Sequence, residues 1–184
     1  MTSKSMKTKI AVILAAGRGV RLDRPDTPKP LVKVGNKPLV LWNILQLQEY
    51  GIDTIYVVIG FRGDEIKKEL ISNPDVTARL EFVCQNDSSE SGMLDSVLAL
   101  SDYDIGPFFM VMVDLIIDKN PYPLFDCIIE DVGGITSLVS TNPINFKQSG
   151  ARTQVLVKGD HVVSVGLDIS EFNGLDVGVY LFGK

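Results

Sequence analysis

Two glycines, Gly17 and Gly19, follow directly on an apolar segment near the start of the chain. The segment Ile10–Leu14 is a continuous run of β-forming residues, which is typical of a strand buried on both faces. In open α/β sheets, ligands bind beyond the carboxyl ends of the strands. Because glycine adopts positive φ readily, the backbone after this strand can approach a ligand closely and point consecutive amides at an anion.

The same stretch carries three cations, Arg18, Arg21 and Lys29. Arg can bind a phosphate through two parallel hydrogen bonds, whereas Lys acts as a point charge. Together with the glycines, these cations suit a triphosphate better than a neutral ligand. The alternatives are a structural turn and a degenerate dinucleotide-binding fingerprint, in which Leu22 stands at the third glycine position. A Walker A loop is excluded because no Gly-Lys-Ser/Thr follows.

A carboxylate, Asp114, ends the most hydrophobic run of the chain, residues 108–113. A carboxylate at this place would be costly if it were buried without a partner. It becomes understandable if it faces a ligand and holds Mg²⁺, which is usually bound by one or two carboxylates plus phosphate oxygens and water. The alternative is a helix N-cap, a position at which Asp is common. Asp118, further along, is expected in a turn.

Composition limits the class of protein. A length of 184 residues, with 45% hydrophobic and 22% charged residues, fits one soluble domain. The net charge of −5 argues against a nucleic-acid partner, and no apolar run approaches the ~18–20 residues that would insert into a membrane. Cys84 and Cys127 form no zinc spacing, are expected to be buried thiols, and fit a cytoplasmic location. His161, the single histidine, is expected to be exposed and structural. Because the sequence shows no Ser/His/Asp or Cys/His arrangement, covalent catalysis is not indicated.

Strand-like and helix-like segments alternate along the chain. Helices are expected over residues 38–50, closed by Gly51, over 64–70 with Asp64 as the N-cap, and over 92–100. Strands are expected at Ile10–Leu14, Thr54–Ile59, 80–84, 108–113, Ile135–Ser140 and 176–182, with a hairpin of 153–158 and 161–165. This pattern predicts an α/β, Rossmann-like fold: a mostly parallel mixed sheet with helices on both faces and a late β-hairpin. We expect residues 1–8 to be a disordered leader and 9–184 to be one domain.

The sequence LAAGRGVRL, followed by PKPL, resembles the signature of the sugar-phosphate nucleotidyltransferase family. The usual pattern of that family is Leu-Ala-Ala-Gly-x-Gly-x-Arg-Leu and then Pro-Lys-Pro-Leu. The layout of VVSVGLDISEFNGLDVGVYLF is similar to inositol-1-phosphate and phosphocholine cytidylyltransferases. The resemblance implies an enzyme that moves a nucleoside monophosphate from an NTP, with CTP favoured, onto a phosphorylated sugar or polyol, with inositol-1-phosphate favoured. Pyrophosphate is the other product.

The resemblance also assigns roles to individual residues. Asp114 and Asp176, the latter in a segment similar to the family's Asp-x-Gly motif, would hold Mg²⁺. Arg21 and the amides of Gly17 and Gly19 would hold the β- and γ-phosphates, while Lys29 would neutralise the α-phosphate and the acceptor phosphate. The expected catalytic residues are Arg21, Lys29, Asp114 and Asp176. The expected nucleotide-binding residues are Leu14, Ala15, Ala16, Gly17, Gly19, Arg21, Lys29, Gln85 and Gly92.

Some features depart from the family pattern and leave alternatives open. Residues 92–98 resemble the family's base-contacting Gly-Thr-Ala-x-Ala-Leu segment only loosely, so a polar loop that caps a helix is the other interpretation. Leu167 stands where a lysine that holds the acceptor phosphate is expected, and Lys158 is a candidate to replace it. Family catalytic domains usually continue past the last predicted strand, which predicts that the chain is a fragment of a longer protein.

Three competing functions remain. One is a hexose-1-phosphate uridylyl-, thymidylyl- or guanylyltransferase. Another is a non-catalytic nucleotide-binding regulatory module, motivated by Leu167. A nicotinamide-dependent oxidoreductase is disfavoured, because it needs an acidic ribose ligand at the end of the second strand, and that strand ends at Gly60. The sequence leaves a homo-oligomer open.

Overall fold

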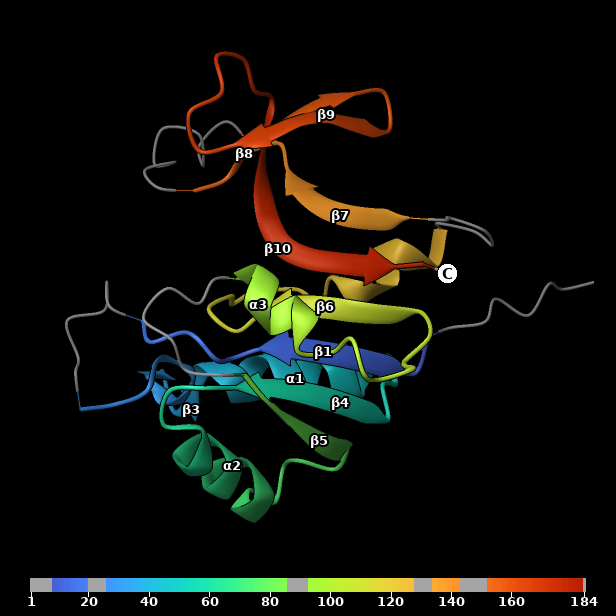
Figure 1. The fold of residues 1–184 in the computed structure, drawn as a ribbon. Coiled ribbons are helices and arrows are strands. Elements are labelled where there is room, and N and C mark those ends of the chain that lie inside the picture. Colours follow the sequence, from blue (N-terminus) through green and yellow to red (C-terminus); the bar gives the residue numbers. More distant parts are fainter. Residues whose placement is uncertain (1–7, 20–25, 86–92, 128–133, 143–151, 184) are drawn as a thin grey trace, which may run out of the picture.

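An eight-stranded sheet forms the centre of the computed structural model, which describes residues 8–19, 26–85, 93–127, 134–142 and 152–183. The strand order is β5-β4-β1-β6-β10-β8-β9, and β7 pairs with β10 (Figure 1). The strands are β1 (Ile10–Leu14), β4 (Thr54–Ile59), β5 (Arg79–Cys84), β6 (Phe108–Met112), β7 (Ile135–Ser140), β8 (Gln154–Lys158), β9 (His161–Gly166) and β10 (Gly174–Phe182). A small separate sheet pairs β2 (Lys33–Val34) with β3 (Lys37–Pro38).

The first half of the sheet is parallel. β1 pairs with β4 on one side and β6 on the other, and β4 pairs with β5. Parallel neighbours need crossover connections, and here the crossovers carry α1 (Leu39–Tyr50), α2 (Gly63–Ser72) and α3 (Met93–Leu98). As predicted, Gly51 closes α1 in the left-handed conformation, with a φ of 101°.

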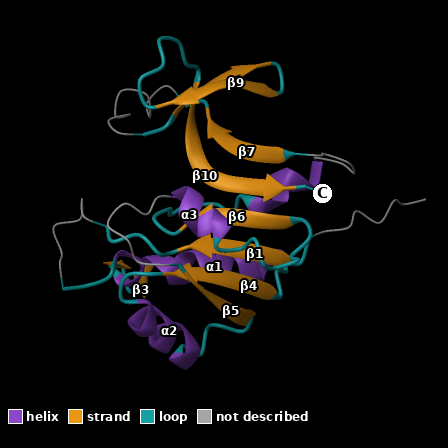
Figure 2. Cartoon of the chain, in the orientation of Figure 1, coloured by secondary structure: helices purple, strands orange, loops and turns teal. Residues whose placement is uncertain are grey.

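The second half of the sheet is antiparallel. β10 pairs in this way with β6, β7 and β8, and β8 pairs with β9. The predicted hairpin is confirmed, with Gly159 at its turn and a φ of 59°. The late strands therefore extend the sheet beyond β6, as Figure 2 shows in orange.

Helices cover both faces of the sheet. Side chains of β1 alternate, so that Ala11, Ile13 and Ala15 join one core cluster while Val12, Leu14 and Ala16 join the other. The first cluster includes residues of α1, α2 and the 3-10 helix η2 (Tyr122–Cys127), and the second packs against α3. Figure 1 shows α1 behind the sheet and α3 in front. The predicted Rossmann-like α/β fold is confirmed. None of the described helices is both long and apolar enough to cross a membrane.

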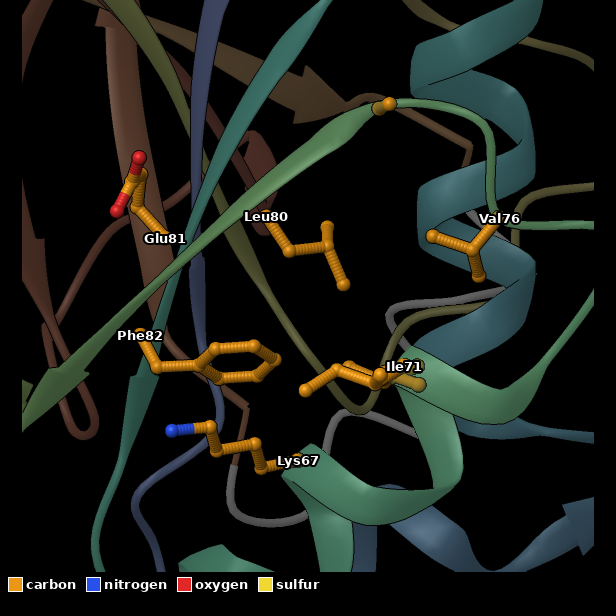
Figure 3. A pocket seen from close by; sticks show the side chains of 8 residues that line it. Lys67, Ile71, Val76, Leu80, Glu81 and Phe82 are labelled. Atoms are coloured by element: carbon orange, nitrogen blue, oxygen red, sulfur yellow. The ribbon is translucent and has the colours of Figure 1, made fainter.

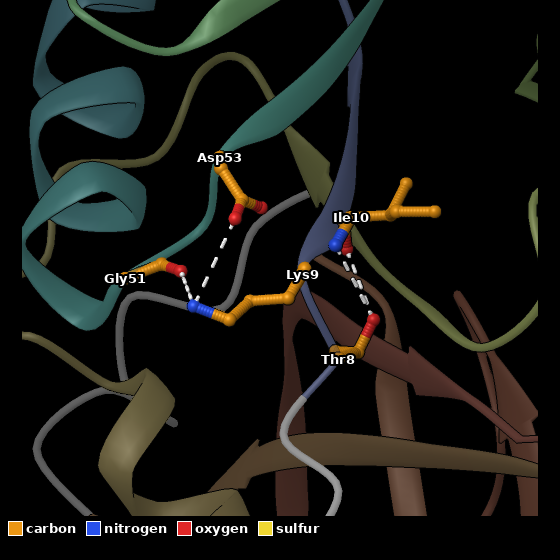
Figure 4. Close-up of polar contacts among 5 residues, drawn as sticks. All are labelled: Thr8, Lys9, Ile10, Gly51 and Asp53. Carbon is orange, nitrogen blue, oxygen red and sulfur yellow. Dashed lines mark hydrogen bonds and ion pairs between the residues drawn. The ribbon is translucent and has the colours of Figure 1, made fainter.

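Polar contacts fix the amino end of β1 (Figure 4). Lys9 Nζ donates to the carbonyl oxygen of Gly51 at 2.9 Å and lies 3.9 Å from Asp53 Oδ2. Thr8 Oγ1 accepts from the amide of Ile10 at 3.4 Å and donates to the carbonyl of Pro107 at 2.5 Å. These contacts join β1 to the residues that follow α1 and precede β6, and the carboxyl end of β1 leads into the first loop.

Two local expectations are wrong. Asp64 does not cap α2: the N-cap is Arg62, with a φ of 53°, and Asp64 lies in the first turn, where a carboxylate suits the helix dipole. Cys84 and Cys127 are exposed rather than buried. Cys84 ends an edge strand and Cys127 ends a short 3-10 helix, so an apolar local sequence does not put either thiol in the core.

Candidate active site

The first loop leaves the sheet where the backbones of β1, β4 and β6 meet. The amide of Ala15 donates to the carbonyl of Val58 at 2.9 Å, and the amide of Val113 donates to the carbonyl of Leu14 at 3.3 Å. Leu14, Ala15 and Ala16 are buried. Of these three predicted nucleotide-binding residues, Leu14 ends β1, and Ala15 and Ala16 continue the backbone pairing beyond it, which fixes the start of the loop.

Gly60, the residue that follows β4, lies against the first loop. A Cβ on Gly60 would lie 3.0 Å from the carbonyl oxygen of Ala16 and 3.1 Å from its Cβ. The first loop therefore passes directly against the end of β4, and a side chain there would displace it. The acidic ribose ligand that an oxidoreductase needs has no room at this position.

Gly19 brings the first loop against Lys29. It has a φ of 64°, and a Cβ on it would lie only 2.7 Å from the Cβ of Lys29. Glycine is needed here both for the backbone conformation and for the close approach. Lys29 itself begins the 3-10 helix η1 (Lys29–Leu31), which is closed by a hydrogen bond from the amide of Leu31 to the carbonyl of Pro28 at 2.8 Å. The stem of Lys29 is held between these segments.

The two predicted catalytic residues Lys29 and Asp114 meet at this place. Lys29 Nζ lies 2.5 Å from Asp114 Oδ2, although 85 positions separate the residues in sequence. Their side chains are 25% and 40% exposed, so the pair is open to solvent. The helix-cap alternative for Asp114 is wrong, because Asp114 itself lies in a turn and the next helix, η2, begins only at Tyr122.

Asn43 positions the backbone around Asp114 and was not anticipated from the sequence. Its side-chain amide donates to the carbonyls of Leu39, Val113 and Leu115 at 3.1, 3.2 and 3.3 Å. Asn43 is 4% exposed and lies on the buried face of α1. A polar residue among the apolar positions of a helix indicates a buried hydrogen-bonding role, since buried amides need partners.

Asp176 is held by three donors from β7 and β10. Its carboxylate accepts from Ser137 Oγ at 3.2 Å, from the amide of Gly178 at 3.1 Å and from the hydroxyl of Tyr180. Burial, and then the hydrogen bond to Asp176, raise the pKa of Tyr180 above its ordinary value, so the hydroxyl keeps its proton. Ser137 and Tyr180 therefore orient the carboxylate. Neither residue was predicted from the sequence.

A bulge makes the contact between Asp176 and Tyr180. The register between β10 and β7 shifts between these two residues, and Gly178 between them has a φ of 77°. A Cβ on Gly178 would lie 2.8 Å from Met112 Cγ. The Asp-x-Gly pattern thus has a physical basis here, because the glycine permits both the bulge and the close approach of β10 to β6.

Asp114 and Asp176 lie at the same end of two neighbouring strands. Asp114 comes two residues after Met112, Asp176 comes two residues before Gly178, and Met112 and Gly178 are in contact. Two carboxylates suit Mg²⁺ when phosphate oxygens and water supply the remaining ligands. Within the described residues no group of three or more metal-binding side chains occurs. The two carboxylates therefore fit a divalent cation whose remaining ligands are phosphate oxygens of a bound substrate and water.

Gln85 and Ser96 form a second polar contact, beyond β5. Ser96 Oγ donates to Gln85 Oε1 at 2.5 Å, and the amide of Gln85 continues the pairing to the carbonyl of Ile59 at 2.8 Å. Ser96 is buried in α3, while Leu94 and Leu98 of this helix are exposed. The amide side chain of Gln85 is thereby oriented. Gly92 and Arg21, the two other predicted contacts, lie outside the described residues.

An open groove of about 510 Å³ lies elsewhere, between α2 and the edge strand β5 (Figure 3). It is lined by Lys67, Leu70, Ile71, Val76, Ala78, Leu80, Glu81 and Phe82. None of these is a predicted site residue, and the groove is a feature separate from the first loop.

Comparison with known proteins identifies the family. Residues 11–120, more than half of the chain, match the family described as the MobA-like NTP transferase domain. The chain belongs to this family. The matched region contains the first loop, Lys29, Asn43 and Asp114, and it ends before β10 and Asp176.

Individual relatives of this NTP transferase domain are longer proteins. The bifunctional IPC transferase and DIPP synthase of Rubrobacter xylanophilus is 31% identical over 176 residues, which are 95% of this chain and 38% of that protein. The probable glucose-1-phosphate cytidylyltransferase of Bacillus subtilis is 41% identical over 61 residues, 32% of this chain and 24% of that protein. The aligned regions thus cover well under half the length of either relative.

A solved structure shows the same fold. The inositol-1-phosphate CTP transferase from T. maritima superposes with a TM-score of 0.78 at 23% sequence identity. The superposition covers 97% of this chain and 72% of that one. The antiparallel late strands of this NTP transferase domain are therefore part of a shared architecture.

Proposed function

We propose that this domain transfers a cytidylyl group from CTP to inositol-1-phosphate and releases pyrophosphate. The observation that carries this proposal is the 31% identity to the IPC transferase and DIPP synthase across 95% of the chain. The fold it shares with an inositol-1-phosphate CTP transferase supports the same substrates. CTP is also the nucleotide suggested by the likeness to a glucose-1-phosphate cytidylyltransferase.

The reaction needs no nucleophile from the protein. An oxygen of the acceptor phosphate attacks the α-phosphorus of CTP, the bond from that phosphorus to the bridging oxygen breaks, and pyrophosphate leaves. Both reactants are anions, so the main tasks of the protein are positioning and charge neutralisation. The first loop and Lys29 supply amide donors and positive charge where the strands end.

The β- and γ-phosphates bind to the first loop in this proposal. Gly17 and Gly19 supply backbone amides, Arg21 supplies a guanidinium, and Lys29 approaches the α-phosphate. Support comes from Gly19, whose positive φ and close packing on Lys29 hold the loop and the lysine in a single unit. Gln85, oriented by Ser96, contacts the base together with Gly92.

Asp114 and Asp176 hold Mg²⁺ in this proposal. When bound, the cation polarises the α-phosphate and increases its reactivity toward the acceptor. Asn43 fixes the backbone on both sides of Asp114, while Ser137 and Tyr180 orient Asp176. Partners of this kind fix the orientation of metal-binding carboxylates and are needed for full affinity.

The acceptor binds beyond β10, toward β8 and β9. Gly166, Gln154 and Leu175 form one row across these strands, and Leu167 and Asp176 are the next residues at the same end. Two strand spacings separate Leu167 from Asp176 by about 10 Å. Leu167 is 55% exposed and thus lies within reach of an acceptor.

Lys158 is badly placed to replace the lysine that is missing at position 167. It pairs with His161 at the turn of the hairpin, four residues from Gln154 along β8. Four residues of a strand span about 13 Å, so Lys158 lies at the far end of the hairpin. Arg152, which is exposed and precedes Thr153, lies at the other end of β8, where Thr153 pairs with Asp176.

A hexose-1-phosphate is the second candidate acceptor. The observation in its favour is the 41% identity to the glucose-1-phosphate cytidylyltransferase, which is confined to 61 residues. A regulatory module that binds NTP without turnover remains a third candidate, because Leu167 removes a charge that the acceptor phosphate would use.

A screen of pyrophosphate release tests the three candidates together. CTP, UTP, dTTP and GTP are each combined with inositol-1-phosphate, glucose-1-phosphate and mannose-1-phosphate, with Mg²⁺ present. We expect turnover with CTP and inositol-1-phosphate, and a strongly reduced rate in the Asp114→Ala variant. Turnover with a hexose-1-phosphate alone overturns the polyol acceptor. Nucleotide binding without turnover of any pair overturns the enzyme proposal.

A further inference from the structure

Both carboxylates proposed to hold the cation already have partners within the chain. Asp114 accepts from Lys29, and Asp176 accepts from Ser137, Gly178 and Tyr180. The two sites differ in kind among the residues that the structure describes, because there the partners of Asp176 are neutral whereas Asp114 has a cationic one. A dication that approaches Asp114 therefore meets a carboxylate whose charge is already compensated.

Packing fixes the aliphatic part of the Lys29 side chain, so only its terminal ammonium group can change partners. The position of a Cβ on Gly19 lies 2.7, 3.3 and 3.2 Å from the Cβ, Cγ and Cδ atoms of Lys29, so the first loop lies against the stem of this side chain. The Nζ atom beyond that stem meets Asp114 at 2.5 Å. An anion on the first loop would compete with Asp114 for the same ammonium group.

We propose that Lys29 and the divalent cation compete for Asp114, so that the cation binds together with the NTP rather than before it. This inference rests on the proposed function, because it takes Asp114 as the ligand of the cation. Without NTP, a cation must displace a charge-assisted hydrogen bond and leave the Lys29 ammonium beside it, which disfavours binding. When NTP is bound, the ammonium group of Lys29 donates to the phosphate oxygens instead, and Asp114 becomes available to bind the cation.

The affinity for a free cation distinguishes this competition from a role in which Lys29 only binds phosphate. Removing a lysine that only binds phosphate leaves the affinity for a free cation unchanged. Removing a lysine that competes for Asp114 raises that affinity. In the absence of nucleotide, the Lys29→Met variant should therefore bind a divalent cation more tightly than the wild-type chain.

Mn²⁺ titration followed by electron paramagnetic resonance tests the proposal without catalysis. With no nucleotide present, Lys29→Met should bind Mn²⁺ about tenfold or more tightly than wild type, the gain expected when one charge-assisted hydrogen bond need not be broken. Lys33→Met, at an exposed lysine of β2, is the matched control and should bind as wild type. Lys29→Arg keeps the charge and should also leave Mn²⁺ affinity low. The double variant Lys29→Met with Asp114→Asn should lose the gain.

Addition of a non-hydrolysable CTP analogue completes the test. The advantage of Lys29→Met should shrink or reverse, because wild-type Lys29 now neutralises phosphate. Equal or weaker Mn²⁺ binding by Lys29→Met without nucleotide overturns the competition, and Lys29→Gln repeats the test if the Met variant does not fold. Failure of the proposed function appears elsewhere, as the absence of pyrophosphate release from every substrate pair.

Discussion

Asn43 binds the carbonyl groups on both sides of Asp114. Its side-chain amide lies 3.2 Å from the carbonyl oxygen of Val113 and 3.3 Å from that of Leu115. The buried face of α1 thereby sets the position of a carboxylate that follows β6, 71 positions later in the chain. The exposed side of this segment can then offer Asp114 to Lys29.

Replacing Asn43 should therefore damage both stability and activity. Asn43→Leu keeps a similar volume but leaves buried carbonyl groups without a donor, which costs about 1–3 kcal/mol. Urea unfolding should show this loss, and kcat for pyrophosphate release should fall because Asp114 is no longer held in place.

Gln46→Leu is the control for that experiment. Gln46 Nε2 donates to the carbonyl of Ile117 at 2.6 Å, a contact of the same chemistry that lies three residues beyond Asp114. It should destabilise the fold and largely retain kcat. If both variants lose kcat in proportion to stability, Asn43 has only a structural role.

Asp114 itself should be essential for turnover. Asp114→Ala removes the proposed cation ligand and should lower the rate by about 10²–10⁴, or about 3–5 kcal/mol in the transition state. Pyrophosphate release at saturating Mg²⁺ measures the loss. Asp118→Ala, at an exposed bend close by, should leave the rate unchanged. An Asp114→Ala variant with wild-type activity would remove Asp114 from the proposed site.

Lys29→Met should lower kcat more than it weakens CTP binding. Charge near the α-phosphate changes mainly in the transition state, so the lysine contributes most there. Steady-state kinetics and equilibrium CTP binding separate the two effects, with Lys33→Met as the control at an exposed lysine. An increase in KM alone would show that Lys29 binds the ground state and the transition state equally.

Gly178 should be required for the position of Asp176. A Cβ there meets Met112 Cγ at 2.8 Å, and the φ of 77° strains any side chain. Gly106→Ala is a matched control, because Gly106 has a φ of 59° and no atoms within 4 Å of its Cβ position. Both variants should lose about 1–2 kcal/mol of stability from the backbone. Only Gly178→Ala should also lose kcat, and equal kcat in both variants contradicts a role for the bulge.

The first loop could be predicted because its chemistry is local. Glycines and cations that follow an apolar strand predict a close backbone approach and positive charge. The structure shows the close approach, since Gly19 has a positive φ and packs on Lys29, while phosphate binding stays a prediction. The bounds of these two strands could also be predicted from the sequence, since the apolar residues of Ile10–Leu14 and Thr54–Ile59 match the buried positions. The antiparallel pairing of β10 with β6 was not, because pairing partners depend on the whole topology.

The partners of the carboxylates could not be predicted for a related reason. In a regular strand, Asp176 and Tyr180 would lie about 13 Å apart. Only the bulge at Gly178 brings the hydroxyl to the carboxylate, and no sequence period reveals it. Cys84 shows the opposite error, because its apolar neighbours suggest burial while its place at the end of an edge strand exposes it.

Leu167→Lys should improve binding of the acceptor. Leu167 is exposed and lies at the same end of the antiparallel strands as Asp176, about 10 Å away, which a lysine side chain can bridge in part. A charge-assisted contact to the acceptor phosphate contributes about 1.5–3 kcal/mol, which corresponds to a fall in the acceptor KM of about tenfold or more. Val163→Lys is the control, because this exposed residue lies on β9 away from that end. The KM for CTP should not change in either variant. An unchanged acceptor KM in Leu167→Lys, with inositol-1-phosphate as the acceptor, would place the acceptor phosphate away from β9.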